Sequence, residues 1–258
     1  MTGACELRHM LPDDLSLRYQ PIVSPTTGRL LAVEALLRRD GETSAPLALL
    51  ADAAASGYAD RLDRMVLEWA CAQMRAWREQ GLHVPVHVNV SAATATSAAA
   101  PRFASWLSQL PIPRGALTIE LTETTRIRGI RDLVRFVETC RAAGFEIALD
   151  DFGCGYSTLR LLQRFRSDAV KLDRGFVAPL PDDAWTRAIV RHMIALAHDL
   201  GMRVIAEGVE TQAQAGWLRR LECDEIQGYG IARPMTGDEI ARWAAHRDEP
   251  PAAAGDCA

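Results

Sequence analysis

The stretch that decides the fold is Ile147-Ala-Leu-Asp-Asp-Phe-Gly-Cys-Gly-Tyr-Ser157, in which an apolar run ends in two adjacent acids and a glycine-punctuated loop. Its first three residues predict a parallel strand that is buried on both faces. Asp150 and Asp151 follow where this strand leaves the core, and neighbouring strand residues point to opposite sides. Two acids that serve one site therefore need an irregular strand end or a bound cation. The simpler alternative is a strand-to-loop junction with an Asx turn and solvated acids.

Apolar runs and helical periodicity alternate on both sides of this stretch. The expected strands are Leu15–Val23, Leu30–Leu37, Val84–Val90, Leu117–Leu121, Glu146–Leu149, Ala169–Leu172, Arg203–Ala206 and Glu225–Tyr229. The expected helices are Pro46–Ser56, Arg61–Gln80, Phe103–Leu110, Ile130–Ala143, Trp185–Leu200, Thr211–Leu221 and Gly237–His246. The turn-forming cluster Ser24–Gly28 predicts a hairpin, so the first strand should be antiparallel to its neighbour.

A polar residue stands at the expected end of seven strands: Glu34, Asn89, Glu120, Asp150, Lys171, Glu207 and Gln227. Most of these positions are separated by one strand-plus-helix unit. This spacing is typical of an α/β protein with a (β/α)8 TIM-like barrel, in which functional groups meet at the carboxyl ends of the strands. We expect an N-terminal extension over 1–14, one barrel domain over 15–247, and a disordered tail over 248–258.

Composition excludes several classes of protein. A net charge of −4 and 48% hydrophobic residues are ordinary for a globular domain and argue against a protein that coats nucleic acid polymers. No apolar run approaches the length of a membrane span, and no signal sequence is recognisable, so a cytoplasmic protein without a membrane span is expected. The six scattered cysteines contain no C-x-x-C pair and are interpreted as reduced thiols.

Two residue types occur once each in this chain. Lys171 is the only lysine among 29 basic residues, and Asn89 is the only asparagine. Both fall at expected strand ends, where a functional requirement would explain why arginine, aspartate or glutamine has not replaced them. Chance is the alternative explanation.

The acids expected on one rim are hard oxygen ligands, which suit Mg²⁺ or Mn²⁺ better than structural zinc. Their number suggests two ions, as in phosphoryl-transfer sites. Lys171 could orient an attacking water molecule, and Arg38 could hold a phosphate oxygen. Taken singly, an acid at a strand end is more often a solvated rim charge, an arginine such as Arg38 a surface ion-pair partner, and a glutamine such as Gln227 a loop hydrogen-bonder.

Several motifs together resemble the EAL-domain cyclic di-GMP phosphodiesterase family. They are Tyr19-Gln-Pro-Ile22, Glu34-Ala-Leu-Leu-Arg38, Val88-Asn-Val-Ser91, Glu120-Leu-Thr-Glu123, Asp150 to Ser157, Lys171-Leu-Asp173, Ala206-Glu-Gly-Val-Glu-Thr211 and Gln227-Gly-Tyr229. The resemblance runs from about Leu17 to Met235. It implies a barrel enzyme that opens cyclic di-GMP to linear 5'-pGpG with two Mg²⁺ or Mn²⁺ ions, is inhibited by Ca²⁺, and forms a homodimer.

The same resemblance implies roles for individual residues. Metal ligands are expected at Glu34, Asn89, Glu120, Asp150, Asp151 and Glu207, and catalytic roles at Glu34, Lys171, Glu207 and Asp151. Substrate contacts are expected at Arg38, Gln20, Asp173 and Gln227. Glu123 is expected to anchor the loop that follows Asp151.

The chain departs from the family pattern at a few positions. Cys154 replaces the usual threonine, Gly230 stands where a bulky apolar residue is common, and the segment between Arg38 and Leu47 is short. No cyclase or sensor domain is expected ahead of the first strand, so a separate regulatory protein is a possible partner. Two alternatives remain open: a receptor that binds cyclic di-GMP without cleaving it, and a barrel that only binds another protein.

Overall fold

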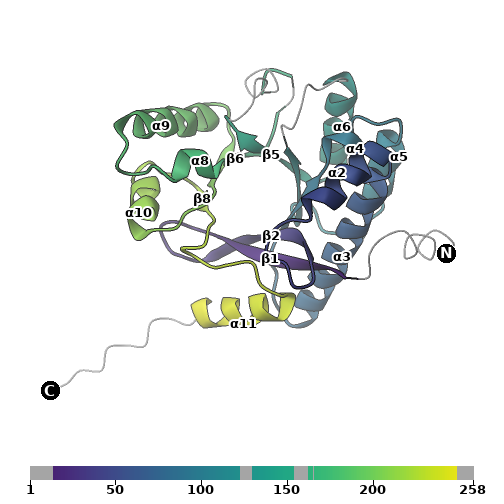
Figure 1. Cartoon of the computed structure of the whole chain (residues 1–258), viewed down its shortest axis with the longest axis horizontal. Coiled ribbons are helices and arrows are strands. Elements are labelled where there is room, and N and C mark those ends of the chain that lie inside the picture. The colour runs from purple at the N-terminus through teal and green to yellow at the C-terminus, as the bar shows by residue number, and fades with distance from the viewer. Residues whose placement is uncertain (1–13, 123–129, 154–161, 165, 249–258) are drawn as a thin grey trace.

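Eight strands close into a barrel in the order of the sequence (Figure 1). The computed structural model describes residues 14–122, 130–153, 162–164 and 166–248. Glu123 and Cys154 lie outside these ranges, so their expected roles stay predictions. The strands are β1 (Leu15–Val23), β2 (Leu30–Arg39), β3 (Val86–Val90), β4 (Leu117–Thr122), β5 (Glu146–Phe152), β6 (Ala169–Leu172), β7 (Arg203–Ala206) and β8 (Glu225–Ile226).

Helices surround the barrel and connect most of its strands (Figure 1). They are α2 (Leu47–Ser56), α3 (Ala59–Glu79), α4 (Ala92–Ala95), α5 (Ala100–Leu107), α6 (Ile130–Ala143), α8 (Arg174–Val177), α9 (Ala184–Asp199), α10 (Gln212–Arg220) and α11 (Gly237–Asp248). The predicted TIM-like barrel is confirmed. The short helices α4 and α8 are additions to the expected set, and α11 extends the expected last helix to Asp248.

The predicted hairpin is also present. β1 pairs with β2 in antiparallel register from Leu15↔Arg39 to Val23↔Leu30, whereas β2 runs parallel to β3. β1 is antiparallel to β8 as well, and one residue pair, Val23↔Ile226, closes the barrel there. Parallel strands need a crossover, but this antiparallel pair needs only the turn, and β1 has no connecting helix of its own.

The expected position of Glu34 at a strand end is wrong. Glu34 lies in the middle of β2, because β2 continues to Arg39 against β1 after its last pair with β3, Ala35↔Val88. The last strand is shorter than expected. β8 ends at Ile226, so Gln227 lies just after the strand, because the backbone from Gln227 onward forms hydrogen bonds with the loop after β7.

Most strand residues are buried on both faces of the barrel wall, because side chains fill the interior and helices cover the outside. The run at Ile147–Leu149 is buried on both faces, as predicted, with no residue more than 2% exposed. One apolar cluster packs the strands against the helices, and a second, separate cluster consists of Ile22, Ala32, Ala148, Ala169 and Ile205. Glu34 and Lys171 lie two residues after Ala32 and Ala169 on their strands, and Glu120 pairs with Ala148. All three side chains therefore face the barrel interior, as this second cluster does.

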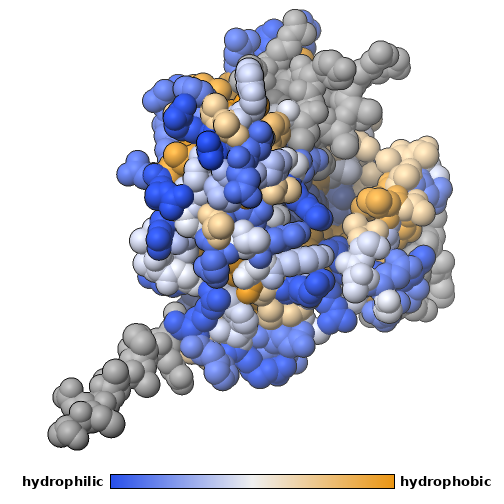
Figure 2. Space-filling view, turned by 60° about the vertical axis from the view of Figure 1, so that its left-hand side comes forward, coloured by the Kyte–Doolittle hydropathy of each residue, from blue (hydrophilic) through white to orange (hydrophobic). Residues whose placement is uncertain are grey.

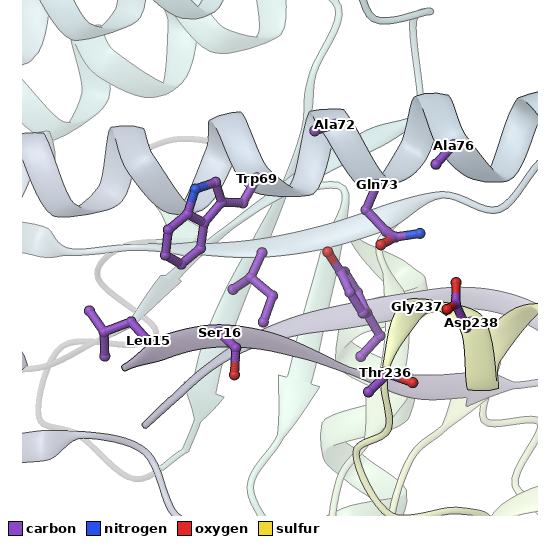
Figure 3. A pocket seen from close by; sticks show the side chains of 11 residues that line it. Leu15, Ser16, Trp69, Ala72, Gln73, Ala76, Thr236, Gly237 and Asp238 are labelled. Carbon is purple, nitrogen blue, oxygen red and sulfur yellow. The ribbon is translucent and has the colours of Figure 1, made fainter. Parts of the chain in front are cut away.

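The outer face of β1 forms the floor of a groove between α3 and α11 (Figure 3). Its volume is ≈ 550 Å³, and Leu15, Tyr19, Trp69 and Gly237 are among its lining residues. The Trp77 indole donates to the Gly237 carbonyl at 2.9 Å and thereby ties α3 to the start of α11. The groove exists because no helix between β1 and β2 is available to cover this part of the wall.

The surface in Figure 2 is mainly hydrophilic, and hydrophobic residues reach it in small groups. This agrees with the balanced composition of the chain. Within the described ranges, no helix has both the length and the apolar content that crossing a membrane would require.

Asp63 joins α3 to the end of β3. Its Oδ2 accepts hydrogen bonds from the Ser91 amide at 3.0 Å, the Ser91 hydroxyl at 2.9 Å and the Thr94 hydroxyl at 2.6 Å. Ser91 in turn caps α4 by accepting from the Thr94 amide. Burial raises the pKa of Asp63 to about 6, although these hydrogen bonds oppose the shift.

We expect Asp63 to make stability fall with rising pH. Its carboxyl binds a proton more tightly in the folded protein, with a pKa of about 6, than in the unfolded chain, where it is about 3.9. That advantage is lost as pH rises through 6. The free energy of unfolding of the native protein, relative to Asp63→Asn, should therefore fall by about 2 kcal/mol between about pH 4.5 and pH 7. Urea denaturation measures both proteins; a difference independent of pH would contradict the prediction.

Candidate active site

The Lys171 ammonium lies at the centre of four carboxylates on the inward side of the barrel. Its Nζ is 2.7 Å from Glu120 Oε2, 2.7 Å from Glu207 Oε1, 3.2 Å from Glu34 Oε2 and 3.7 Å from Asp150 Oδ1. Lys171 itself is completely buried. The structure therefore brings together residues from β2, β4, β5, β6 and the end of β7, which lie far apart in the sequence.

Glu34 is the most firmly held of these acids. Asn89 Nδ2 donates to its Oε1 at 2.8 Å, and Gln227 Nε2 donates to its Oε2 at 2.8 Å. Burial alone would raise the pKa of Glu34, but the Lys171 charge and the amide hydrogen bonds lower it to about 2. Glu34 is consequently an ionised carboxylate with a fixed orientation.

One ammonium does not neutralise four carboxylates. Burial alone would lower the pKa of Lys171, but the surrounding acids raise it well above its ordinary value, so the ammonium stays charged. Burial raises the pKa of Glu120 well above its usual range, and the charge of Glu34 adds to this shift. Burial likewise raises the pKa of Glu207 to about 8. The charges of Glu34 and Asp150 add to both shifts, so a further cation beside these acids would be electrostatically favourable.

Asp150 and Asp151 occupy an irregular part of β5. The register with β6 passes from Leu149↔Val170 to Phe152↔Leu172, so an advance of three residues along β5 matches an advance of only two residues along β6. Asp151 has a φ of 55°, and its amide donates to Asp150 Oδ1 at 2.9 Å. This bulge is the irregular strand end that two neighbouring acids require, and it turns Asp150 toward Lys171.

A pocket of ≈ 290 Å³ opens beside the carboxylates. The predicted site residues that line it are Gln20, Glu34, Arg38, Asp150, Glu207 and Gln227. Arg174, Glu210 and Tyr229 also line it, and the Arg233 guanidinium stacks 4.4 Å from the centre of the Tyr229 ring. Burial lowers the pKa of Arg38 despite nearby Glu34, but an arginine keeps its charge at neutral pH. The pocket thus combines cationic, aromatic and acidic groups.

Gln20 and Gln227 connect the two ends of the chain inside this pocket. Gln227 Nε2 donates to Gln20 Oε1 at 3.0 Å, and Gln20 Nε2 donates to the Ala232 carbonyl at 3.1 Å. The Gln227 Oε1 atom is buried without a hydrogen-bond partner in the described structure. A buried oxygen of this kind can accept a hydrogen bond or bind a cation.

Asp173 is the one predicted substrate contact, of four, that does not line this pocket. Its carboxylate accepts from the Gly175 amide at 2.8 Å and caps α8 directly after β6. The expected substrate contact of Asp173 stays a prediction. Asp151 also does not line the pocket, so its expected metal contact stays a prediction.

His87 is a site residue that sequence reasoning missed, as are the pocket-lining residues Arg174, Glu210 and Tyr229. Its Nδ1 lies 2.8 Å from Glu120 Oε1, and both side chains are almost completely buried, at 1% and 0% exposure. The alternation of β3 contained the signal, because His87 precedes Asn89 by two residues and so faces the same side.

The loops after β7 and β8 pack backbone against backbone. The Val209 amide donates to the Gln227 carbonyl at 3.0 Å, and the Gly230 amide donates to the Val209 carbonyl at 2.9 Å. A Cβ atom on Gly228 would lie 2.2 Å from the Val209 backbone, and one on Gly230 would lie 2.6 Å from the Glu210 backbone. Glycine at both positions is what allows these loops to hold Glu207 and Gln227 close together.

The donor set fits a hard divalent cation. It consists of carboxylate and amide oxygens, it carries an excess of negative charge, and it includes the unpartnered Gln227 Oε1. In the part of the chain that the structure describes, however, no three His, Cys, Asp or Glu side chains are already arranged to hold a metal ion. The physical reason is that Glu120 and Glu207 point their oxygens at Lys171 Nζ.

Comparison with protein families and curated proteins finds one consistent group. The model of the EAL domain family matches residues 4–234. The Pseudomonas aeruginosa protein named bifunctional diguanylate cyclase/cyclic di-GMP phosphodiesterase MucR is 36% identical over 232 residues, covering 88% of this chain and 34% of that protein. Cyclic di-GMP phosphodiesterase NbdA of the same organism is 35% identical over 241 residues, covering 89% and 30%. The chain thus spans about a third of the length of these curated relatives.

Solved structures give the same picture. The EAL domain of Mycobacterium smegmatis DcpA has a TM-score of 0.76 at 32% identity, with 91% of this chain and 97% of that chain covered. The PaMucR phosphodiesterase in complex with c-di-GMP has a TM-score of 0.79 at 35% identity, with 91% and 99% covered. A manganese/c-di-GMP complex of Klebsiella pneumoniae BlrP1 has a TM-score of 0.77 at 29% identity, with 88% and 58% covered.

Proposed function

The chain belongs to the EAL domain family, and from this premise we propose that it is a phosphodiesterase that hydrolyses cyclic di-GMP to linear 5'-pGpG. The observation that carries the proposal is the convergence of four carboxylates and Lys171 beside a pocket that contains Arg38. The similar PaMucR phosphodiesterase, whose structure is a c-di-GMP complex, supports the substrate class.

The reaction consumes one water molecule and breaks one of the two phosphodiester bonds. The water oxygen forms a bond to phosphorus, the bond from phosphorus to the 3'-oxygen breaks, and a proton from the water ends on that oxygen. The product carries a 5'-phosphate and a free 3'-hydroxyl, which is 5'-pGpG.

We propose that two divalent ions, Mg²⁺ or Mn²⁺, bind to Glu34, Asn89, Glu120, Asp150, Asp151 and Glu207. The manganese/c-di-GMP complex of BlrP1 supports a metal-dependent site of this kind. Bound divalent ions would activate water and stabilise the charge that develops at phosphorus. The Oε2 oxygen of Glu120 and the Oε1 oxygen of Glu207, which contact Lys171 Nζ, would have to move from Lys171 toward the ions.

The chain's own residues would position the reactants. Lys171 is a compact charge that can donate a hydrogen bond to the attacking water or to a phosphate oxygen. Arg38 offers a planar pair of donors to a phosphate. Gln20 and Gln227 line the same pocket and are proposed substrate contacts, and so is Asp173, which would have to leave its capping position on α8.

The test is incubation of the purified chain with cyclic di-GMP and Mg²⁺, followed by chromatographic separation of the products. We expect 5'-pGpG to form, and exhaustive chelation to abolish its formation. Ca²⁺ should inhibit, because it favours a larger and looser ligand shell than Mg²⁺. Unchanged turnover after chelation, or equal turnover with Ca²⁺, would contradict the strict metal site.

A receptor that binds cyclic di-GMP without cleaving it is the second candidate function. The observation in its favour is that the acids now surround an ammonium and are not arranged around a metal position. Binding of cyclic di-GMP without product formation, in the presence of either Mg²⁺ or Mn²⁺, would identify this alternative.

We further propose that the chain forms a homodimer through α9. Trp185, Ile189, Leu196 and Leu200 are exposed, with Trp185 at 81%, and their spacing of four, seven and four residues places them on one helix face. An apolar stripe of this spacing is typical of a helix that packs against a partner helix. The repetition of the same stripe in a second copy would make the contact self-complementary.

An Ile189→Glu variant is expected to be monomeric. A charge in the centre of the stripe would be buried without a partner in the dimer. Arg191→Glu introduces the same residue on another exposed part of α9 and should leave the dimer intact. Multi-angle light scattering decides between the two states: native protein that stays at 28.3 kDa across the micromolar range would contradict the dimer.

A further inference from the structure

His87 and Glu120 form a buried pair directly behind the Lys171 cluster. We propose that His87 is a positioning residue, which holds Glu120 in the orientation that binding of a divalent cation requires. This inference rests on the proposed function, because it assumes that Glu120 is a metal ligand. His87 itself would touch neither the substrate nor the ion.

The barrel places His87 for this role. β3 and β4 are parallel neighbours in which Asn89 pairs with Glu120 and His87 with Thr118, so the imidazole approaches Glu120 from two residue pairs deeper in the barrel. His87 Nδ1 is 2.8 Å from Oε1, while Lys171 Nζ is 2.7 Å from Oε2. Each oxygen of Glu120 therefore has its own nitrogen partner, and the two partners come from different strands.

The direction of the His87 hydrogen bond follows from the chemistry of a ligand. A carboxylate that binds a cation is ionised and can only accept hydrogen bonds, so His87 Nδ1 must be the donor in that state. Any form of the ring that carries a proton on Nδ1 can supply this hydrogen bond at the observed distance of 2.8 Å.

Loss of this donor would affect Glu120 in two ways. Oε1 would be buried without a partner, and the carboxylate would be free to rotate fully toward Lys171, away from an ion. Groups that orient a metal ligand from behind typically change metal affinity by about 10–100-fold when they are removed. A buried imidazole that only filled space would have no such effect.

Three substitutions separate the hydrogen bond from packing. His87→Asn keeps an N–H donor near the position of Nδ1. His87→Leu has nearly the shape of asparagine without a donor, and His87→Phe keeps an aromatic ring without a donor. If the pair with Glu120 matters, the asparagine variant should behave like the native protein, and the other two should behave alike.

The experiment measures Mn²⁺ binding to the metal-free proteins by calorimetry, together with their thermal melts and without substrate. We expect His87→Leu and His87→Phe to bind Mn²⁺ about 10-fold or more weakly, and His87→Asn to stay within about 3-fold of the native protein. The differences in affinity should not follow the order of the melting temperatures. If one of the two donor-free variants does not fold, the other still provides the comparison with asparagine.

Two outcomes would overturn the proposal. One is that the donor-free variants bind Mn²⁺ as tightly as the native protein. The other is that asparagine restores nothing, which would mean that the ring acts by packing. Native protein that binds no Mn²⁺ would instead contradict the proposed metal-dependent function, so the two failures are distinguishable.

Discussion

Replacement of Lys171 by arginine is expected to lower kcat by at least ~100-fold, which corresponds to about 2.7 kcal/mol of transition-state stabilisation. Both residues are cationic, so the effect tests shape and not charge. The ammonium is a point charge that fits between Glu120 and Glu207 at 2.7 Å from each, whereas a guanidinium is broad and planar. In that space it would displace the carboxylates or intrude on the scissile phosphate.

The complete burial of Lys171 changes what the variant should do to stability. From the sequence alone, a nearly intact fold is expected for Lys171→Arg. Since Lys171 is among the largest fully buried side chains of the protein, the longer arginine should overpack the barrel interior and cost about 1–3 kcal/mol. Steady-state kinetics and a thermal melt of the same preparation measure the two effects. Near-native kcat would show that Lys171 supplies only diffuse positive potential.

Gly228→Ala is expected to lower kcat by a similar factor of at least ~100 and to destabilise the protein by several kcal/mol. The new Cβ would lie 2.2 Å from the Val209 backbone, and no side-chain rotation can relieve a clash with a main chain. The loops after β7 and β8 would have to separate. Because Glu207 and Gln227 stand at the beginning of these loops, the geometry around Lys171 and Glu34 would change with them.

Gly216→Ala is the matched control for this change. Gly216 lies in α10, where an added Cβ would have its nearest neighbour at 3.9 Å, so the same substitution should be neutral or stabilising. Urea denaturation and kinetics of both variants make the comparison. Equal effects of the two substitutions would show that the close approach at Gly228 is unimportant.

The pattern of strands and helices could be predicted because it depends on local signals. The bounds of β1, β6, β7 and α6 agree with the sequence-based expectation to the residue, since turn residues or a terminal glycine flank these elements. The exact extent of β2 and β8 could not be predicted. Glu34 lies inside β2 because β1 continues to pair with it, and β8 stops early because Val209 takes its hydrogen bonds.

The membership of the site was easier to predict than its arrangement. Periodic polar residues marked Glu34, Glu120 and Lys171, but no sequence signal indicated that the three would be joined by direct ion pairs. His87 was missed because a histidine within an apolar strand is usually a core residue. Gly230, a departure from the family pattern at sequence level, is explained by the 2.6 Å approach to the Glu210 backbone, which a bulky residue would prevent.

The single residue pair between β1 and β8 has a kinetic consequence. The β1–β2 hairpin forms from neighbouring residues, but Val23 and Ile226 come from opposite ends of the chain, so their pairing carries a larger entropic cost than any other pairing between two of the eight strands. This seam should be the last part of the barrel to form and the first to open, with the least protection of its amides against hydrogen exchange. Gln20 and Gln227 bridge the same seam. Each transient opening of this seam would therefore also separate Gln20 from Gln227 and disrupt the substrate pocket. The pocket would remain assembled only as long as the barrel stays closed.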